Sequence, residues 1–496
     1  MLIALQFLTF FLSLASYSAW LMVGGYVFLE CALLSLFAFC LLFAVMDFRR
    51  RFVLVMFLSS FFLFLLSSVA LHVFGVDAPF MGVFPGFFNT FSSEVVATTL
   101  NLLFISLLAL LLGFVLGGSG PHSGGFVSKP VDVRYQTVVS EVSRVLFFVT
   151  IPAGLMRVLV KVLFVQSLGY LASYTSYAGA GPLLEKLAVV NTVCFFIFLG
   201  TMPGKRAARL PIYAYLVING MTLFSGVRND AVIAVLLVTV YYIYRSTLEE
   251  RQKRLSEPGS KTGGVGGITT NPWVSGHERR LAVGAMTGGV VLLSYWSYYR
   301  VGLSVEHLSI LGLFLEFFKA QGGSINVIAH GVNLASYLPS TNVSYVFGPV
   351  ISWVNSSILS ELLGGSGASV AHTVDMAFRG NNFGQTITYL VMPTNYLAGV
   401  GMGSSYIAEL FVDFGYSGVV VYNLLLGFTL SRFSRMSERV ENPFVFAAMM
   451  LALQGLLFLP RDVALAWLTN LLNFTTLATF VLVSAVVSIR MHREGS

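Results

Sequence analysis

Long apolar runs recur along most of the chain, and short polar stretches separate them. A helix crosses the hydrocarbon core of a bilayer with about 20 apolar residues, so each run is a candidate membrane-spanning helix. The runs cover residues 2–20, 26–46, 52–73, 95–116, 144–166, 187–203, 209–225, 231–245, 281–299, 415–431, 443–460 and 463–489. This pattern predicts an all-α, polytopic integral membrane protein with about twelve transmembrane helices.

Two longer polar segments divide the chain. Residues 246–280 are rich in Lys, Glu, Ser and Gly, which predicts a flexible cytoplasmic loop. Residues 301–414 are too apolar to be disordered, and we expect a large extracytoplasmic loop whose amphipathic helices lie on the membrane surface or cap a cavity. Helical periodicity places these helices at about 305–319, 324–337 and 349–363. The expected units are therefore residues 1–300 with nine spans, 301–414, and 415–496 with three spans and a cytoplasmic tail.

The composition supports the membrane class, because 56% of residues are hydrophobic and only 10% are charged, against about 25% in soluble proteins. Arg49, Arg50 and Arg51 follow the second run and mark a cytoplasmic loop, which places both termini in the cytoplasm. Only eight of the 29 Lys and Arg residues fall at or beyond the outer half of the predicted membrane. The net charge of +7 therefore follows from this asymmetry and calls for no nucleic acid partner.

The sequence lacks the common cofactor motifs. The three cysteines all lie in apolar runs, and no HExxH, CxxC or P-loop pattern occurs. We therefore expect no metal site, no nucleotide site and no cofactor.

Residues 399–418, GVGMGSSYIAELFVDFGYSG, join the outer loop to a predicted span. Glu409 and Asp413 are four residues apart, and on a helix that spacing places both carboxylates on one face, just above the bilayer. The preceding glycines permit close backbone approach to a ligand. This stretch is the first candidate site.

Cations on the outer side form the second set of candidates. Arg157 lies within a predicted span with Lys161 one turn later, and a charge at that depth costs at least about 2.5–3.5 kcal/mol on insertion scales. The two side chains either line an anion pathway or extend to the lipid headgroups. Arg228, Arg300 and Arg461 lie at the outer ends of other spans. Together with Arg157 they indicate a polyanion such as phosphate bound at the outer leaflet. The alternative is surface ion pairing, as of Arg228 with Asp230.

The outer loop also contains histidines, of which His372 and Asp375 have helical i, i+3 spacing. His330 and His372 are either ligand-binding groups or structural histidines. Tyr299 belongs to an aromatic cluster, SYWSYY, that forms either an interfacial belt or a platform on which sugar rings stack.

Four segments together resemble the bacterial O-antigen or oligosaccharide-repeat-unit polymerases called Wzy. They are FSGVRNDAVIAVLLV, EFFKAQGGSINVI, GVGMGSSYIAELFVDFGYSGVVVYNLLLG and LPRDVALAW, and the resemblance covers most of residues 200–490. It implies a GT-C-like glycosyltransferase architecture at the periplasmic face of the bacterial inner membrane. It also implies transfer of a growing glycan from undecaprenyl pyrophosphate to the next lipid-linked repeat unit, with a Wzz-type chain-length co-polymerase as partner.

The resemblance also implies residue roles. Arg228, Glu409 and Arg461 match its motifs, and Arg300 is placed by context. We expect the three arginines to hold the pyrophosphate with Arg157 in support, and Glu409 to act as the base, with Asp413 as the alternative carboxylate. The further expected substrate contacts are Lys161, Arg379, His330, His372 and Tyr299. Two other functions stay open: an O-antigen ligase, which would need a loop histidine, and a flippase, which would need cations in a central cavity.

Overall fold

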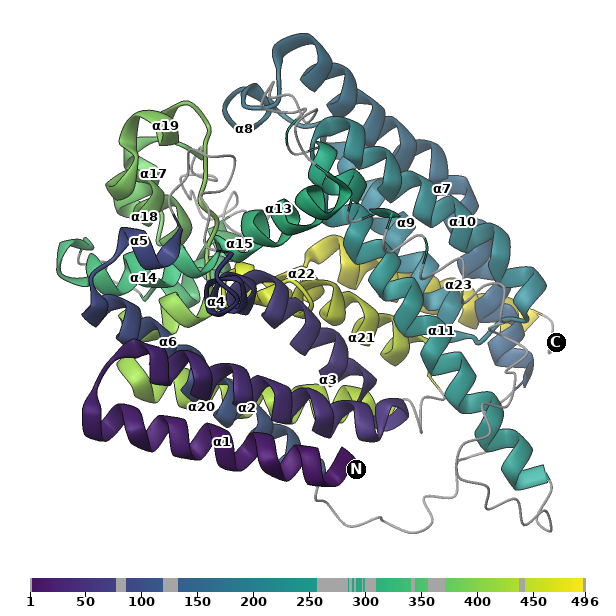
Figure 1. The fold of residues 1–496 in the computed structure, drawn as a ribbon. Coiled ribbons are helices and arrows are strands. Elements are labelled where there is room, and N and C mark those ends of the chain that lie inside the picture. The colour runs from purple at the N-terminus through teal and green to yellow at the C-terminus, as the bar shows by residue number, and fades with distance from the viewer. Residues whose placement is uncertain are drawn as a thin grey trace.

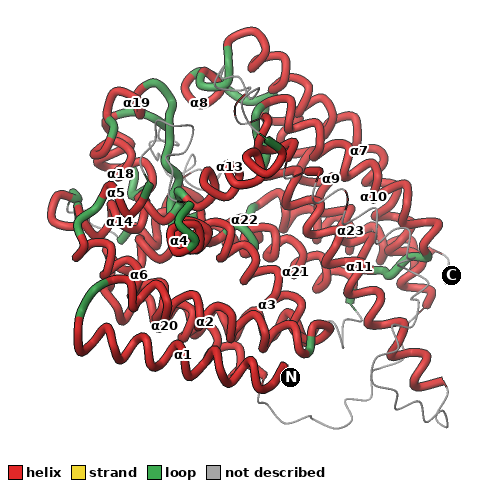
Figure 2. The backbone as a smooth tube through the Cα atoms, in the orientation of Figure 1, coloured by secondary structure: helices red, strands yellow, loops and turns green. Residues whose placement is uncertain are grey.

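The computed structural model describes residues 2–76, 86–118, 133–256, 284, 288–289, 291–296, 298, 309–339, 344–355, 371–436 and 442–493. Helices form all the regular structure of these residues, and no strand occurs among them (Figure 2). The predicted all-α class is confirmed.

One group of helices comes from the N-terminal part of the chain and one later helix. Its members are α1 (Leu2–Val23), α2 (Tyr26–Met46), α3 (Phe48–Phe61), the π-helix η1 (Phe62–Leu66), α4 (Ser67–Val73), α5 (Phe87–Thr90), α6 (Ser93–Gly118) and α20 (Tyr406–Met436). In Figure 1, α1, α2, α6 and α20 run side by side.

Glycines bring α6 and α20 unusually close together. A Cβ atom at Gly427 would lie 2.0 Å from the carbonyl oxygen of Leu110, and one at Gly113 would lie 2.0 Å from the carbonyl oxygen of Leu424. Small residues at such interfaces let helix backbones pack closely in membranes, where van der Waals contact drives helix association.

A second group of helices is linked to α7 directly or through one another. It comprises α7 (Val133–Leu168), α8 (Ala172–Thr175), α9 (Pro182–Gly200), α10 (Lys205–Met221), η2 (Thr222–Ser225), α11 (Asn229–Ser256), α21 (Pro443–Leu456), α22 (Ala466–Leu471) and α23 (Phe474–Arg493). The short helix η5 (Leu459–Arg461) follows α21 and packs against α20 and η1 of the first group. The buried Asn191 on α9 donates a 2.8 Å hydrogen bond to the carbonyl oxygen of Phe147 on α7. Arg490 pairs with Glu141 at 2.6 Å and joins α23 to α7.

The predicted outer loop folds into short helices. These are α13 (Ile310–Gly322), α14 (Ile325–Asn333), η3 (Ala335–Tyr337), η4 (Tyr345–Phe347), α15 (Gly348–Asn355), α17 (Val374–Arg379), α18 (Phe383–Val391) and α19 (Pro393–Leu397). The first turns of α13, α17 and α18 are capped by side-chain oxygens of Ser309, Thr373 and Asn382. In Figure 1, α17–α19 lie at the end of the molecule away from both termini, and α13 lies between the two helix groups.

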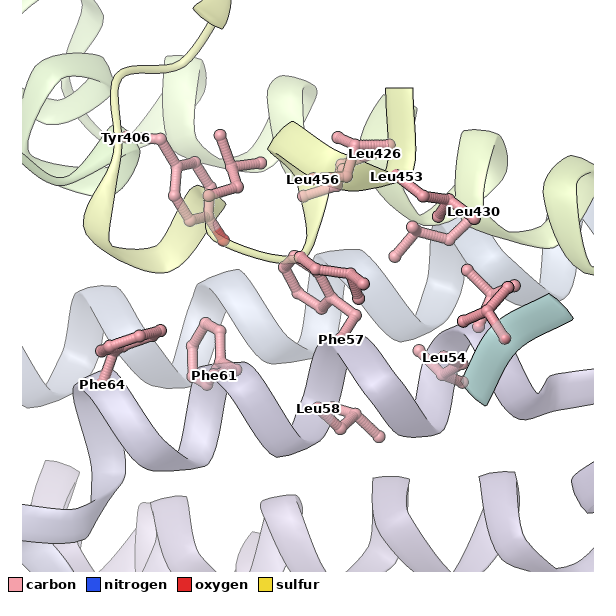
Figure 3. Close-up of a cluster of buried hydrophobic side chains, with 14 of the residues drawn as sticks. Leu54, Phe57, Leu58, Phe61, Phe64, Tyr406, Leu426, Leu430, Leu453 and Leu456 are labelled. Atoms are coloured by element: carbon pink, nitrogen blue, oxygen red, sulfur yellow. The ribbon is translucent and has the colours of Figure 1, made fainter. Parts of the chain in front are cut away.

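The core joins these parts along one face of α3 and η1. Figure 3 shows side chains of this face pointing toward residues of α20 and α21, with Phe57 and Phe61 opposite Tyr406 and Leu456. All four side chains are almost completely buried. This packing sets the position of η1 and α20, which both contribute to the site described below.

Nine helices of the described residues are long and apolar enough to cross a membrane. Of the other three predicted spans, residues 209–225 correspond to α10 and η2, residues 443–460 to the shorter α21 and η5, and residues 281–299 are described only in part. The count of twelve stays a prediction. The expected loop at residues 246–280 begins as helix, because α11 continues to Ser256; residues 257–280 lie outside the described residues.

Candidate functional site around Arg461

The stretch predicted as the first candidate site begins with irregular backbone. Gly399 and Gly403 have φ angles of 92° and 84°, which side-chain-bearing residues rarely adopt. Helix α20 then begins at Tyr406, nine residues before the predicted span, and bends at Gly415, whose φ of 63° and ψ of −154° suit only glycine. The bend separates the turn that carries Glu409 and Asp413 from the rest of α20.

Glu409 lies at the centre of the site and has an exposed fraction of 0%. The hydroxyl of Ser404 donates to its Oε1 at 2.7 Å, and the backbone N–H of Ala464 donates to its Oε2 at 2.9 Å. Both carboxylate oxygens are therefore engaged within the protein. Glu409 thereby joins the segment before α20 to the chain that follows η5.

Arg461 ends η5 and extends toward α13. Its Nη1 donates to Oε1 of Gln321 at 3.2 Å, and its guanidinium carbon lies 5.9 Å from the centre of the Phe64 ring. The backbone of Gly403 also lies against it, because a Cβ atom there would be 3.8 Å from Nε of Arg461. Gln321 is an uncharged acceptor, so this hydrogen bond orients the guanidinium without neutralising its charge.

The end of α13 that carries Gln321 is held against α4. A Cβ atom at Gly322 would lie 2.4 Å from the hydroxyl oxygens of Ser67 and Ser68, and the Ser67 hydroxyl donates to the carbonyl oxygen of Phe318 at 3.1 Å. These contacts lie next to the π-helix η1, and single π turns often occur at functional sites.

Asp462 follows Arg461 directly and was not among the predicted site residues. Its Oδ1 accepts the N–H of Val463 at 2.8 Å. The side chain is half-buried, and burial raises the pKa of its carboxyl to about 6. The sequence signal was available, because LPRDVALAW places an acid beside the arginine at an outer turn. We call Gln321, Ser404, Glu409, Arg461 and Asp462 the Arg461 site.

Asp413 and Glu409 share one helix turn but contact different elements. Oδ2 of Asp413 accepts the N–H of Val346 at 2.8 Å, which attaches η4 to α20. The burial of Asp413 is only partial. The structure therefore places Asp413 outside the Arg461 site, in a contact that holds η4 against α20.

His372 and Asp375 have helical spacing in the sequence but do not lie on one helix. His372 has a φ of 58° and precedes α17, and its Nδ1 lies 2.9 Å from the carbonyl oxygen of Tyr396. Asp375 instead forms an exposed pair with Arg379, at 3.3 Å. His372 is 8% exposed and packs among aromatic rings, so its surroundings are those of a structural histidine.

His330 lies on α14, where its ring meets Phe91 edge to face at 4.7 Å between ring centres. Burial lowers its pKa to about 4, so the ring is neutral at physiological pH. It therefore offers no positive charge to an anion.

Arg157 and Lys161, the two predicted site cations on α7, are distant in sequence from the residues of the Arg461 site. Arg157 forms an ion pair of its own. Nη1 of Arg157 is 3.6 Å from the carboxylate of Glu185 at the start of α9, and both side chains are partly exposed. This carboxylate offsets the cost expected for a charge within the span. Lys161 is half-buried one turn further along α7.

Arg228 directly precedes α11, and its Nη1 donates to the carbonyl oxygen of Leu293 at 3.4 Å. Tyr299 and Arg300 lie outside the described residues. Of the aromatic cluster beside them, Tyr298 is buried and donates to Oε2 of Glu316 on α13 at 2.8 Å. Its ring is thus part of the packing and not an exposed platform.

The structure brings together two of the predicted catalytic residues, Glu409 and Arg461. Among the described residues, no group of three or more His, Cys, Asp and Glu side chains is arranged to hold a metal ion. A family model described as O-antigen polysaccharide polymerase Wzy matches residues 2–258 and 268–494. No curated protein and no solved structure matches the chain.

Proposed function

Because the chain belongs to the O-antigen polysaccharide polymerase Wzy family, we propose that it transfers a growing glycan from undecaprenyl pyrophosphate to the next lipid-linked repeat unit. The membrane-spanning helices agree with an enzyme whose substrates carry polyprenyl tails. We place the reaction at the periplasmic face of the bacterial inner membrane, with both termini in the cytoplasm. A Wzz-type protein is the proposed partner that sets chain length.

The proposed reaction breaks the bond between the anomeric carbon of the donor sugar and its pyrophosphate. Negative charge develops on the departing oxygen, and oriented cations stabilise such a transition state. Arginine suits this task because its planar fork matches phosphate oxygens. The observation that carries the proposal is Arg461, oriented by an uncharged amide in a chain whose family model spans nearly its whole length.

Other cations have supporting roles in this proposal. Arg228 and Arg300 contribute to pyrophosphate binding, as the family resemblance implies. Arg157 and Lys161, both on α7, bind substrate phosphate. Arg157 is already paired with Glu185, so its share in phosphate binding is the smaller one. Arg379 is exposed and paired with Asp375, which favours a surface role for it.

The geometry of the site bears most directly on which residue acts as the base. The sequence predicts Glu409, and that role stays a prediction. Both oxygens of Glu409 accept hydrogen bonds from the protein and the side chain is fully buried, so contact with a sugar hydroxyl would require these bonds to open. The geometry favours Glu409 as a clamp between the two chain segments of the Arg461 site.

The first experiment is lipopolysaccharide banding in a strain deleted for this gene and complemented with variants. We expect the deletion to leave lipid A–core with a single repeat, wild type to restore the ladder, and Arg461→Ala to fail while the protein accumulates normally. Arg209→Ala is the matched control, because Arg209 is an exposed arginine at the start of α10, on the predicted cytoplasmic side.

Other banding patterns would overturn the proposal. Bare core with accumulated lipid-linked polymer would identify a ligase, and bare core with repeat units confined to the cytoplasmic leaflet would identify a flippase. A ladder restored equally by Arg461→Ala and Arg209→Ala would remove Arg461 from the mechanism.

A further inference from the structure

The Arg461 site contains two carboxylates in different states of engagement. Glu409 is fully buried and uses both oxygens to accept hydrogen bonds from Ser404 and Ala464. Asp462 is half-buried and accepts one hydrogen bond, from the N–H of Val463 to Oδ1. Within the part of the chain that the structure describes, Oδ2 of Asp462 has no hydrogen-bond partner and no ion pair.

Asp462 and Arg461 are consecutive residues, so their Cα atoms are about 3.8 Å apart. The guanidinium extends toward Gln321 on α13, whereas the carboxylate stays beside the N–H of its own following residue. One turn thus presents a cation directed to α13 and a carboxylate that stays within its own loop. A glycosyl transfer needs these two charges on different reacting groups: positive charge at the leaving pyrophosphate and a proton acceptor at the incoming hydroxyl.

We propose that Asp462 is a catalytic residue whose Oδ2 accepts the proton of the acceptor sugar hydroxyl, and that Glu409 is the positioning residue that holds its turn. This inference rests on the proposed polymerase function. Glu409 acts through the chain, because Oε2 holds the N–H of Ala464, two residues after Asp462. The Tyr422 hydroxyl donates to the carbonyl oxygen of the same Ala464. Side chains of α20 therefore hold both the N–H and the carbonyl oxygen of Ala464.

In the proposed step one bond forms and one bond breaks at the anomeric carbon. The acceptor hydroxyl oxygen forms a bond to the anomeric carbon of the donor sugar. The bond from that carbon to the pyrophosphate oxygen breaks, and its electron pair leaves with undecaprenyl pyrophosphate, whose charge Arg461 stabilises. The hydroxyl proton passes to Oδ2 of Asp462.

The titration of Asp462 suits this task. A carboxyl with a pKa raised to about 6 is ionised at neutral pH and is a stronger base than an ordinary aspartate. The titratable groups that interact electrostatically with it are Glu409 and Tyr422 on α20. The neighbouring Arg461 extends its guanidinium toward Gln321. The adjoining π-helix η1, Phe62–Leu66, contributes only apolar side chains.

The test measures elongation of a synthetic undecaprenyl-pyrophosphate-linked repeat unit by the purified full-length protein in lipid vesicles, from pH 5 to pH 8. For wild type we expect kcat to rise with pH and to level off above about 6. Asp462→Asn should lower kcat about 10²-fold or more, abolish the rise and leave KM nearly unchanged. Asp462→Glu should retain a rise with pH and part of the activity.

Asp413→Asn is the matched control, because Asp413 also accepts a backbone N–H but contacts η4. We expect it to lower the unfolding temperature in detergent and to retain the rise of kcat with pH. A purely structural role of Asp462 predicts the same behaviour for Asp462→Asn.

The outcomes separate this inference from the proposed function. A wild-type protein that does not elongate the substrate would overturn the polymerase function and the inference with it. An active wild type combined with a folded Asp462→Asn variant that keeps its kcat and its rise with pH would overturn the inference alone. If Asp462→Asn does not fold, the profile of Asp462→Glu decides, because an unchanged midpoint of its pH rise would exclude Asp462 as the titrating group.

Discussion

Two substitutions of Glu409 separate a structural clamp from a catalytic base. Glutamine has nearly the same shape as glutamate, and its amide can preserve both contacts: Oε1 accepts the N–H of Ala464, and Nε2 donates to the hydroxyl oxygen of Ser404. Glutamine also avoids the cost of burying an ionised carboxylate. We therefore expect Glu409→Gln to change the free energy of unfolding by less than about 1 kcal/mol.

Alanine removes both contacts. The N–H of Ala464 belongs to a residue with an exposed fraction of 0%, and leaving such a donor unsatisfied costs about 1–3 kcal/mol. The hydroxyl of the buried Ser404 also loses its acceptor, and the truncated side chain leaves a cavity. The sum predicts a loss of about 2–5 kcal/mol for Glu409→Ala.

The assay combines thermal unfolding in detergent, followed by intrinsic fluorescence, with lipopolysaccharide banding in the complemented deletion strain. We expect Glu409→Gln to unfold near the wild-type temperature and to restore the ladder, and Glu409→Ala to unfold earlier and accumulate poorly. A Glu409→Gln protein that is as stable as wild type but loses kcat by 10²-fold or more would refute the clamp and identify Glu409 as the base.

Three further predictions concern Gln321, Asp462 and Gly427. Gln321→Glu should raise KM for the lipid-linked donor about tenfold in a vesicle assay, more than Gln321→Ala does, because a carboxylate would pair with Arg461 and compete with phosphate. Asp462→Asn should stabilise the fold at pH 8 by up to about 3 kcal/mol and hardly at all at pH 4. Folding raises the pKa of Asp462, so the folded state holds the proton more tightly than the unfolded state does. The free energy of unfolding of wild type therefore falls as pH rises from about 4 to about 6 and is constant above that range. Thermal unfolding measured against pH checks this prediction. Gly427→Ala should reduce the yield of folded protein in size-exclusion chromatography, because its Cβ would lie 2.0 Å from the carbonyl oxygen of Leu110.

Matched variants and contrary results test these three predictions. Gly220→Ala is the control for the helix contact, because a Cβ atom at Gly220 meets nothing within 4 Å; equal yields for both alanine variants would contradict close packing of α6 and α20. Equal KM values for the Glu and Ala variants of Gln321 would show that charge at this position does not reach Arg461. A constant difference in stability between wild type and Asp462→Asn across the pH range would exclude a shifted carboxyl.

Much of the architecture could be predicted from the sequence, because the length and apolarity of a run are local properties. The runs at residues 2–20, 26–46 and 95–116 correspond to α1, α2 and α6 with boundary differences of at most a few residues. The amphipathic helices predicted at about 305–319, 324–337 and 349–363 overlap α13, α14 and α15, because helical periodicity is also a local property. The family resemblance, drawn from four short segments, agrees with a family model that covers nearly the whole chain.

The sequence also singled out Glu409 and Arg461, since a charge at the end of an apolar run is conspicuous in one dimension. It could not show what those charges contact. Glu409 is bound by Ala464, 55 positions away, and Arg461 by Gln321, 140 positions away. Such pairs depend on how helices pack, and no local pattern encodes them.

Local spacing failed where tertiary contacts decided the backbone or the environment. His372 and Asp375 have helical spacing, but a φ of 58° at His372 takes that residue out of the helix. The position of Asp462 beside Arg461 does not predict its raised pKa, because the partial burial that raises the pKa exists only in the folded chain. The sequence by itself determined a helical membrane protein, because chain composition controls partition into lipid. Its short motifs indicated the family, and its residues fix which charges are available. Only the tertiary structure decided that Glu409 is enclosed with both oxygens engaged and that Asp462 is only partly buried, because enclosure depends on segments that are distant in the chain.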